Sequence, residues 1–125
     1  MKSDAAKLLD RAEECLEEAR QLFGFGHYLG AINRAYYCIF ACTRALLHEN
    51  GFYAKTHQGM MAKFSDLFIR TELIERKHGE ALRYVFRLRQ TSDYDLDADL
   101  TEEDAAFAIE AAIQFMEVAK NILQG

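Results

Sequence analysis

Apolar residues recur at every third or fourth position along almost the whole chain, which is the spacing of one face of an α-helix. The first stripe predicts a helix from about Ser3 to Phe23. It consists of Leu8, Ala12, Cys15, Leu16, Ala19, Leu22 and Phe23. Gly24-Phe25-Gly26 follows, and glycine accommodates a left-handed helix cap. The pattern therefore predicts an amphipathic helix with a defined end.

A second helix is predicted from about His27 to Asn50, with Gly51 at its end. Its apolar residues cover most of the helix circumference rather than one stripe. They are Ile32, Ala35, Tyr36, Ile39, Phe40, Cys42, Leu46 and Leu47. A helix that is apolar on several sides is contacted on several sides, so we expect this one to be central.

Two further helices follow a loop at residues 51–55. Thr56 is a suitable N-cap for a short third helix. The apolar residues of that helix are Met60, Met61, Phe64, Leu67, Phe68 and Ile69. A fourth helix is predicted from about Glu72 to Tyr94. The alternating acidic residues at 95–100 are typical of a solvated loop.

The last helix is predicted to begin after Thr101, because Thr101 is a natural N-cap and the three acidic residues after it suit the helix dipole. Its apolar seam consists of Ala105, Ala108, Ala112, Phe115, Ala119 and Ile122. Short connections favour antiparallel neighbours. The sequence therefore predicts an all-α fold, in which residues 1–125 form a single up-and-down four-helix bundle with one additional short helix.

Composition narrows the class of protein. No apolar run approaches the ~18 residues of a membrane span, and the first residues carry acidic side chains, so we expect a cytoplasmic protein. The formal net charge of −5 argues against a module that coats nucleic acid by bulk charge, and leaves room for a local basic site. The three cysteines lie in helical apolar patterns and are expected to be buried thiols.

The end of the fourth predicted helix has two apolar faces rather than one. Leu82, Val85 and Phe86 form the first face. Ala81, Tyr84 and Leu88 form the second. One face can meet the bundle core, and the other then needs a further partner. A symmetric homodimer is the commonest solution to that requirement.

Arg89 projects along the first apolar face, where an apolar residue is expected, and Asp93 follows one turn later. One interpretation is an intrahelical ion pair with the arginine stem packed flat, contributing a few tenths of a kcal/mol if exposed. The other is that the planar guanidinium grips a phosphate. In that case Asp93 and Tyr94 are the candidate proton acceptor and donor, and Arg89, Asp93 and Tyr94 are the candidate catalytic residues.

A polar line on the second predicted helix supplies candidate substrate-binding residues. Asn33, Tyr37, Arg44 and His48 lie within about 60° of one another by the helical period. They form either a solvent-facing stripe or a seam that lines a groove, with His48 able to titrate near neutrality. Lys55 and His57 flank Thr56 at the start of the third helix, where backbone N–H groups can bind an anion.

Metal and cofactor motifs are scarce. Glu75-Arg76-Lys77-His78 has the Glu-x-x-His spacing of a carboxylate-bridged di-iron bundle, but the motif occurs once in the chain and such a site needs two copies. The sequence contains no phosphate loop, no glycine-rich dinucleotide turn and no Ser-His-Asp order. We therefore expect neither a bound metal nor a cofactor.

Several of these segments together resemble the HEPN domain family, in particular its small stand-alone prokaryotic members. The likeness covers nearly the whole chain. It is carried by Ala31-Ile32-Asn33-Arg34-Ala35-Tyr36-Tyr37-Cys38-Ile39-Phe40, Ala45-Leu46-Leu47, Lys55-Thr56-His57 with Gly59, and Arg89 with Ser92-Asp93-Tyr94. The resemblance implies a helical bundle that dimerises and is often encoded beside a minimal nucleotidyltransferase. In many branches it also implies a metal-independent RNase toxin of a toxin–antitoxin pair.

The chain departs from the pattern of the HEPN nucleases at one position. Those nucleases have an arginine followed, four to six residues later, by a histidine, whereas positions 93–95 here are Asp, Tyr and Asp. Two hypotheses follow. The first is a toxin-like protein that binds RNA or a nucleotide phosphate at a dimer groove and acts as a metal-independent endoribonuclease. The second is a non-catalytic module that binds a nucleotide or a partner and docks onto a nucleotidyltransferase.

Overall fold

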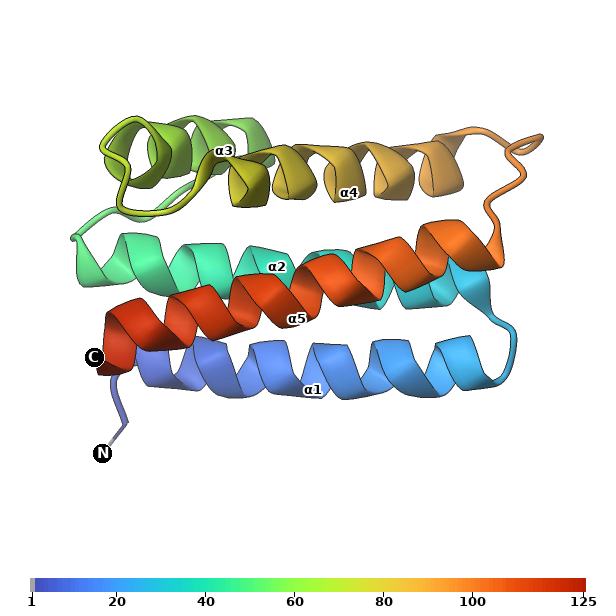
Figure 1. Cartoon of the computed structure of the whole chain (residues 1–125), viewed down its shortest axis with the longest axis horizontal. Helices are drawn as coiled ribbons and strands as arrows, with labels where there is room; N and C mark the ends of the chain where they lie inside the picture. Colours follow the sequence, from blue (N-terminus) through green and yellow to red (C-terminus); the bar gives the residue numbers. More distant parts are fainter. Residues whose placement is uncertain (1) are drawn as a thin grey trace.

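The computed structural model describes residues 2–125, and those residues contain helices and loops without a strand. The helices are α1 (Asp4–Gly24), α2 (Tyr28–Glu49), α3 (His57–Phe64), η1 (Ser65–Ile69), α4 (Arg76–Tyr94) and α5 (Glu102–Gln124). In Figure 1, α1, α2, α4 and α5 lie side by side in alternating directions, and the short α3 runs beside the first half of α4. The expected all-α bundle with an additional short helix is confirmed.

The predicted helix ends correspond to capping interactions in the structure. Ser3 caps α1, and Thr56 accepts a hydrogen bond from the backbone N–H of Gly59 at 2.9 Å. Thr101 and Asp104 form a capping box at the start of α5. Gly26, with φ of 79°, adopts the left-handed conformation after α1. Local side-chain chemistry therefore sets most of the helix boundaries.

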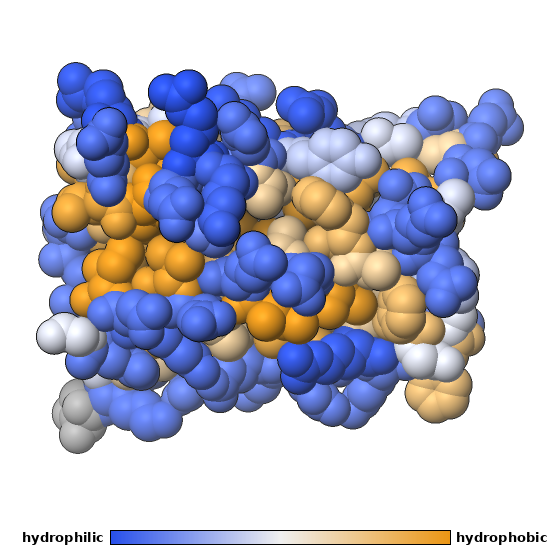
Figure 2. All heavy atoms as spheres, in the orientation of Figure 1, coloured by the Kyte–Doolittle hydropathy of each residue, from blue (hydrophilic) through white to orange (hydrophobic). Residues whose placement is uncertain are grey.

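Helix α2 is the centre of the bundle and contacts α1, α3, α4 and α5. Tyr36, Ile32 and Ile39 are completely buried within it. Many positions facing α2 are alanines, which let neighbouring helices approach closely. The buried alanines of α1 and α5 are Ala5, Ala12, Ala19, Ala105, Ala108, Ala111, Ala112 and Ala119. Figure 2 shows apolar side chains also reaching the surface between polar ones, over the region of α4 and α5.

The expected start of the fourth helix at Glu72 is wrong, because α4 begins at Arg76. Glu72 has a φ of 65°, and the backbone N–H of Ile74 bonds back to the carbonyl of Phe68 at 2.9 Å. This turn buries Ile74 in the core. The sequence has no glycine or proline at this turn. The spacing of apolar residues therefore predicted a helix that continued through it.

The division of α4 into two separate faces is also corrected. Leu88 joins Leu82 and Val85 in the core instead of lying with Tyr84. Tyr84 packs against Phe107 of α5, with ring centres 5.0 Å apart. The second face therefore has a partner within the chain, and the need for a second copy does not follow from it.

The three cysteines are buried and unpaired, as expected of thiols in apolar surroundings. A hydrogen bond shared with Cys42, together with burial, raises the pKa of the Cys38 thiol. Among residues 2–125, no three His, Cys, Asp or Glu side chains are grouped to hold a metal ion. None of the described helices combines the length and apolarity needed to cross a bilayer.

His78 is a buried titratable residue, packed edge-on against Phe115. Burial, and to a lesser extent the charge of Lys77, lowers its pKa below the ordinary value of 6.5. A group whose pKa is lowered on folding contributes stability above its unfolded pKa and loses it as the pH falls through the folded pKa. We therefore expect the free energy of unfolding to decrease between pH 7 and pH 5.

His78→Leu should reduce that decrease, because leucine fills the site without a proton to bind. The measurement is the urea midpoint of wild type and variant at pH 7 and pH 5, followed by circular dichroism. His57 is present in both proteins, so only the contribution of His78 changes. Equal losses of stability in the two proteins on acidification would contradict this assignment.

Candidate functional site

Arg89 lies on the core-facing side of α4, near its C-terminal end. Its side chain is 17% exposed. The guanidinium carbon is 5.4 Å from the ring centres of both Tyr36 and Tyr37 on α2. A guanidinium at this distance from a ring face is attracted to the π-electrons. The arginine is therefore held against aromatic rings rather than extended into water.

Asp93 forms the expected ion pair with Arg89, with 3.2 Å between Nε and Oδ2. The N–H of Nε does not point along this contact, and Nε is buried without a hydrogen-bond partner among the described residues. The carboxylate of Asp93 therefore neutralises the guanidinium on its Nε side without an aligned hydrogen bond.

Tyr36 connects the arginine to a histidine from another helix. The Tyr36 hydroxyl and Nδ1 of His57 are 2.5 Å apart, and the two rings are stacked with centres separated by 5.7 Å. His57 is the first residue of α3, immediately after the cap formed by Thr56. Phe40 and Phe86 pack on the same imidazole, with ring centres 4.6 and 5.8 Å away. We call Tyr36, Tyr37, Phe40, His57, Phe86 and Arg89 the aromatic cluster.

The charges in the aromatic cluster follow from burial and from Arg89. Burial raises the pKa of the Tyr36 hydroxyl, and the nearby Arg89 opposes that shift only in part. Burial lowers the pKa of His57, and the charge of Arg89 lowers it further. At neutral pH, Tyr36 is protonated and His57 is uncharged. His57 is therefore a neutral imidazole next to a fixed cation, which is the state required of a general base.

Two other predicted residues lie at the rim of this cluster. The guanidinium of Arg44 lies 5.8 Å from the ring centre of Phe40. Asn33 accepts a hydrogen bond from Arg34 at 3.2 Å. Arg34 itself lies 5.2 Å from the ring centre of Tyr37 and forms an ion pair with Glu18 at 3.6 Å. The structure therefore brings Asn33, Tyr37 and Arg44 to the neighbourhood of Arg89 and His57.

The remaining predicted site residues lie apart from the cluster. His48 packs its ring against Tyr53, and its buried Nδ1 has no partner among residues 2–125. Lys55 is exposed. Tyr94 is 81% exposed, and no hydrogen bond or ion pair within the described part of the chain joins it to Arg89. The polar line on α2 is thus divided: Asn33, Tyr37 and Arg44 lie near the aromatic cluster, and His48 lies against Tyr53.

Sequence reasoning missed Tyr36, Phe40, Phe86 and Arg34. The aromatic residues have the spacing of core residues, and Tyr36 is completely buried, so the pattern alone gives it no chemical role. The juxtaposition of His57 with Arg89 depends on how α3 folds back over α2 and α4. No spacing within one helix contains that information.

The aromatic cluster lies apart from two surface pockets of the bundle. Two surface pockets of about 850 Å³ each lie elsewhere, one between η1 and the first half of α4 and one between α4 and α5. Neither of them is lined by Arg89 or His57. The chemistry of the cluster therefore suits a ligand that lies across the surface, or one enclosed by a second protein surface.

Comparisons with known proteins identify the family of the chain. A protein named putative toxin, from Methanocaldococcus jannaschii, is 31% identical over 130 residues, covering 99% of this chain and 88% of the relative. A second protein named putative toxin, from the same organism, is 33% identical over 124 residues, covering 99% and 92%. A UPF0332 protein of Thermotoga maritima is 30% identical over 114 residues, covering 91% and 86%. The model of the HEPN domain matches residues 5–122. The chain therefore belongs to the HEPN domain family.

Proposed function

We propose that this chain is a toxin-like HEPN protein of the cytoplasm, which binds RNA phosphate at the aromatic cluster and cleaves RNA without a metal. The observation that carries the proposal is the partly buried guanidinium of Arg89, held against the ring of Tyr36 and beside the Tyr36–His57 pair. The printed name of two relatives, putative toxin, supports the toxin-like part. The nuclease part depends on the chemistry of the cluster.

Metal-independent cleavage of RNA needs a base, an acid and a cation. The base removes the proton of the 2′-hydroxyl, the 2′-oxygen attacks phosphorus, and the leaving 5′-oxygen receives a proton, which yields a 2′,3′-cyclic phosphate. Arg89 stabilises the charge that develops on the phosphoryl oxygens. In this proposal His57 is the base, since its pKa is lowered and it is uncharged at neutral pH.

The tautomer of His57 follows from the role assigned to it. If Nδ1–H donates to the Tyr36 hydroxyl oxygen, Nε2 carries the lone pair that accepts the 2′-hydroxyl proton. Tyr36 then orients the imidazole. Asp93 positions Arg89 through the ion pair. Because the exposed Tyr94 lies apart from the cluster, the leaving 5′-oxygen takes its proton from solvent water. The histidine that is missing after Arg89 is thereby supplied by α3.

Binding of RNA by an acidic chain requires that its cations gather locally. Arg34, Arg44 and Arg89 lie along the aromatic rings of α2, where unpaired bases can stack and phosphates can find charge. Asn33 and Tyr37 are the polar residues at the same rim. We propose that the working form is a homodimer in which a second copy covers the cluster.

A second function is favoured by the furrow between α4 and α5. Tyr84 and Phe107 are 40% and 48% exposed and form its apolar centre. Lys77 and Arg87 line the α4 wall, whereas the α5 wall carries acidic residues. A surface of this kind can dock a partner protein. The alternative proposal is a non-catalytic module that binds a minimal nucleotidyltransferase here.

Cleavage of a single-stranded RNA by the purified protein, in excess chelator, tests the nuclease directly. We expect wild type to form 2′,3′-cyclic phosphate ends, and Arg89→Ala and His57→Gln each to reduce the rate by about a hundredfold or more. Arg87→Ala is the matched control, because Arg87 is an exposed arginine on the same helix that contacts Tyr84 instead of the cluster. Its rate should remain that of wild type.

Absence of cleavage by wild type would rule out the nuclease and leave the docking module. That alternative has its own measurement, which is co-purification with a nucleotidyltransferase encoded by a neighbouring gene. Phe107→Glu should abolish such a complex if the furrow is the docking surface. An equal loss of cleavage in Arg87→Ala would show that any positive charge on α4 suffices, and would contradict the site.

Thermal unfolding distinguishes a functional arginine from a structural one. Because burying the guanidinium of Arg89 costs desolvation that its pair with the partly exposed Asp93 offsets only in part, Arg89→Leu should leave the melting midpoint unchanged or raise it. The side chain of Asp93 is 33% exposed, so water can solvate it after its partner is removed. Arg89→Asp should lower the midpoint by placing a second carboxylate beside Asp93. A fall of several degrees in Arg89→Leu would show that the arginine is retained for stability.

A further inference from the structure

A second cluster of arginines surrounds a pocket at the other end of α4. The pocket has a volume of about 850 Å³ and lies between α3, η1 and the first half of α4. Pockets of several hundred Å³ are the usual size for small-molecule ligands. None of its lining residues belongs to the aromatic cluster. A ligand here would therefore be bound independently of Arg89 and His57.

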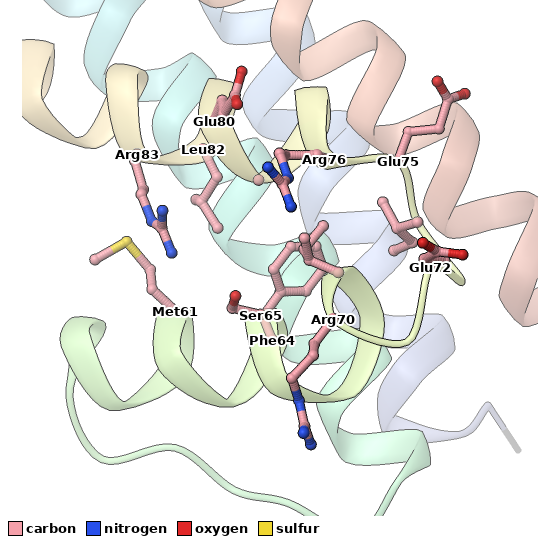
Figure 3. Close-up of a pocket in the computed structure, with 13 residues that line it drawn as sticks. Met61, Phe64, Ser65, Arg70, Glu72, Glu75, Arg76, Glu80, Leu82 and Arg83 are labelled. Carbon is pink, nitrogen blue, oxygen red and sulfur yellow. The ribbon is translucent and has the colours of Figure 1, made fainter.

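Two cations point into this pocket. Arg76 and Arg83 are seven residues apart on α4, which places them on the same face about 10 Å apart along the helix axis. Figure 3 shows both guanidinium groups directed from α4 into the space above Ser65 and Phe64. Neither forms an ion pair with a carboxylate of the described chain. Two guanidinium groups that have no ion-pair partner in the described chain can both bind an anion that enters this pocket.

A third lining arginine serves as the internal comparison. Arg70 bonds Asp66 at 2.8 Å, one helical turn away, and in Figure 3 it points away from the pocket. Its charge is therefore already balanced outside the cavity. Arg76 and Arg83 point into the pocket and Arg70 does not, so arginines in this region do not all point inward.

The floor of the pocket is apolar, whereas its walls carry both apolar and charged side chains. Phe64, Leu82 and Ile74 form a buried base, and Met61 faces Arg83 across the opening in Figure 3. At Gly79, a Cβ atom would lie 3.2 Å from Cγ1 of Ile69, so the helix backbone itself forms part of the wall. A ligand that fills this space needs an apolar body as well as a negative charge.

The rim limits the length of the ligand. Glu72, Glu75 and Glu80 also line the pocket, and in Figure 3 their carboxylates lie at its outer edge, directed away from the two guanidinium groups. A long polyanion would meet these carboxylates as it left the pocket, whereas a small anion would not. The arrangement favours a compact ligand over a nucleic-acid strand.

We propose that this pocket binds a small diphosphate ester that carries an apolar body, with Arg76 and Arg83 each gripping one phosphoryl group. Two guanidinium groups two helical turns apart suit two linked phosphoryl groups better than one. The apolar body lies against the partly exposed side chains of Met61 and Ile69. Both a nucleoside diphosphate and an isoprenoid diphosphate have this chemistry, and the experiment separates them.

The test is isothermal titration calorimetry of the full chain with ADP and with geranyl diphosphate, using inorganic pyrophosphate and adenosine as comparisons. At least one ester should bind about tenfold or more tightly than pyrophosphate, because only the esters bury an apolar body. The tighter of the two identifies the body as heterocyclic or isoprenoid. Arg76→Gln and Arg83→Gln should each weaken that binding about tenfold, as expected from the loss of one charge-assisted contact.

Two matched variants make the result specific. Arg70→Gln removes an arginine that points away from the pocket, and Arg89→Ala removes the cation of the other site, so both should bind the ester as wild type does. Ser65→Leu places a larger side chain in the pocket and should abolish binding, with an unchanged helical circular dichroism spectrum showing that the bundle remains folded. Ester binding that is no tighter than that of pyrophosphate would overturn the proposal. So would an equal loss in Arg70→Gln and Arg83→Gln, or an RNA oligonucleotide that binds more tightly than either ester and depends on Arg83.

Discussion

The packing of Tyr36 is the constraint on which the rest of the site depends. Its ring is completely buried in the central helix, so its hydroxyl must find a partner inside the protein. Nδ1 of His57 is that partner, and this contact fixes the start of α3 against α2. The same ring supports the guanidinium of Arg89 from α4. The buried side chain of Tyr36 thus joins α2 to α3 and α4. It contacts the neutral imidazole of His57 on α3 and the guanidinium of Arg89 on α4.

The sequence is sufficient for the bundle because the relevant signals are local. Thr56 and Thr101 act as caps within three residues of their partners, and helical periodicity identifies α2 as the covered helix. The prediction from helical periodicity fails at Glu72, because the turn there is set by burial of Ile74 and not by a glycine or proline. It also assigns Leu88 to the wrong face. In both cases the deciding interaction lies between segments that are distant in sequence.

The site shows the same division between local and distant signals. Arg89 can be selected from the sequence because a charged residue interrupts an apolar stripe, and Asp93 because it follows one turn later. The role of His57 cannot be selected, since its neighbours Tyr36, Phe40 and Phe86 come from two other helices. His48 illustrates the converse, because it shares a helix face with Tyr37 by angle and yet packs against Tyr53. Angular position on one helix does not specify the element that covers it.

The two proposed anion-binding regions lie in a chain that is acidic overall. The formal net charge is −5, but Arg89 is partly buried on the side of α4 that faces α2, and the exposed Arg76 and Arg83 line one pocket. Low dielectric strengthens the interaction of an anion with a partly buried guanidinium, and water and salt screen the exposed carboxylates. Local geometry therefore outweighs net charge over the few ångströms that decide binding. In the proposed mechanism, a histidine from α3 takes the place of the one missing after Arg89, since catalysis requires the imidazole and the guanidinium to be close in space, and their order along the chain is irrelevant.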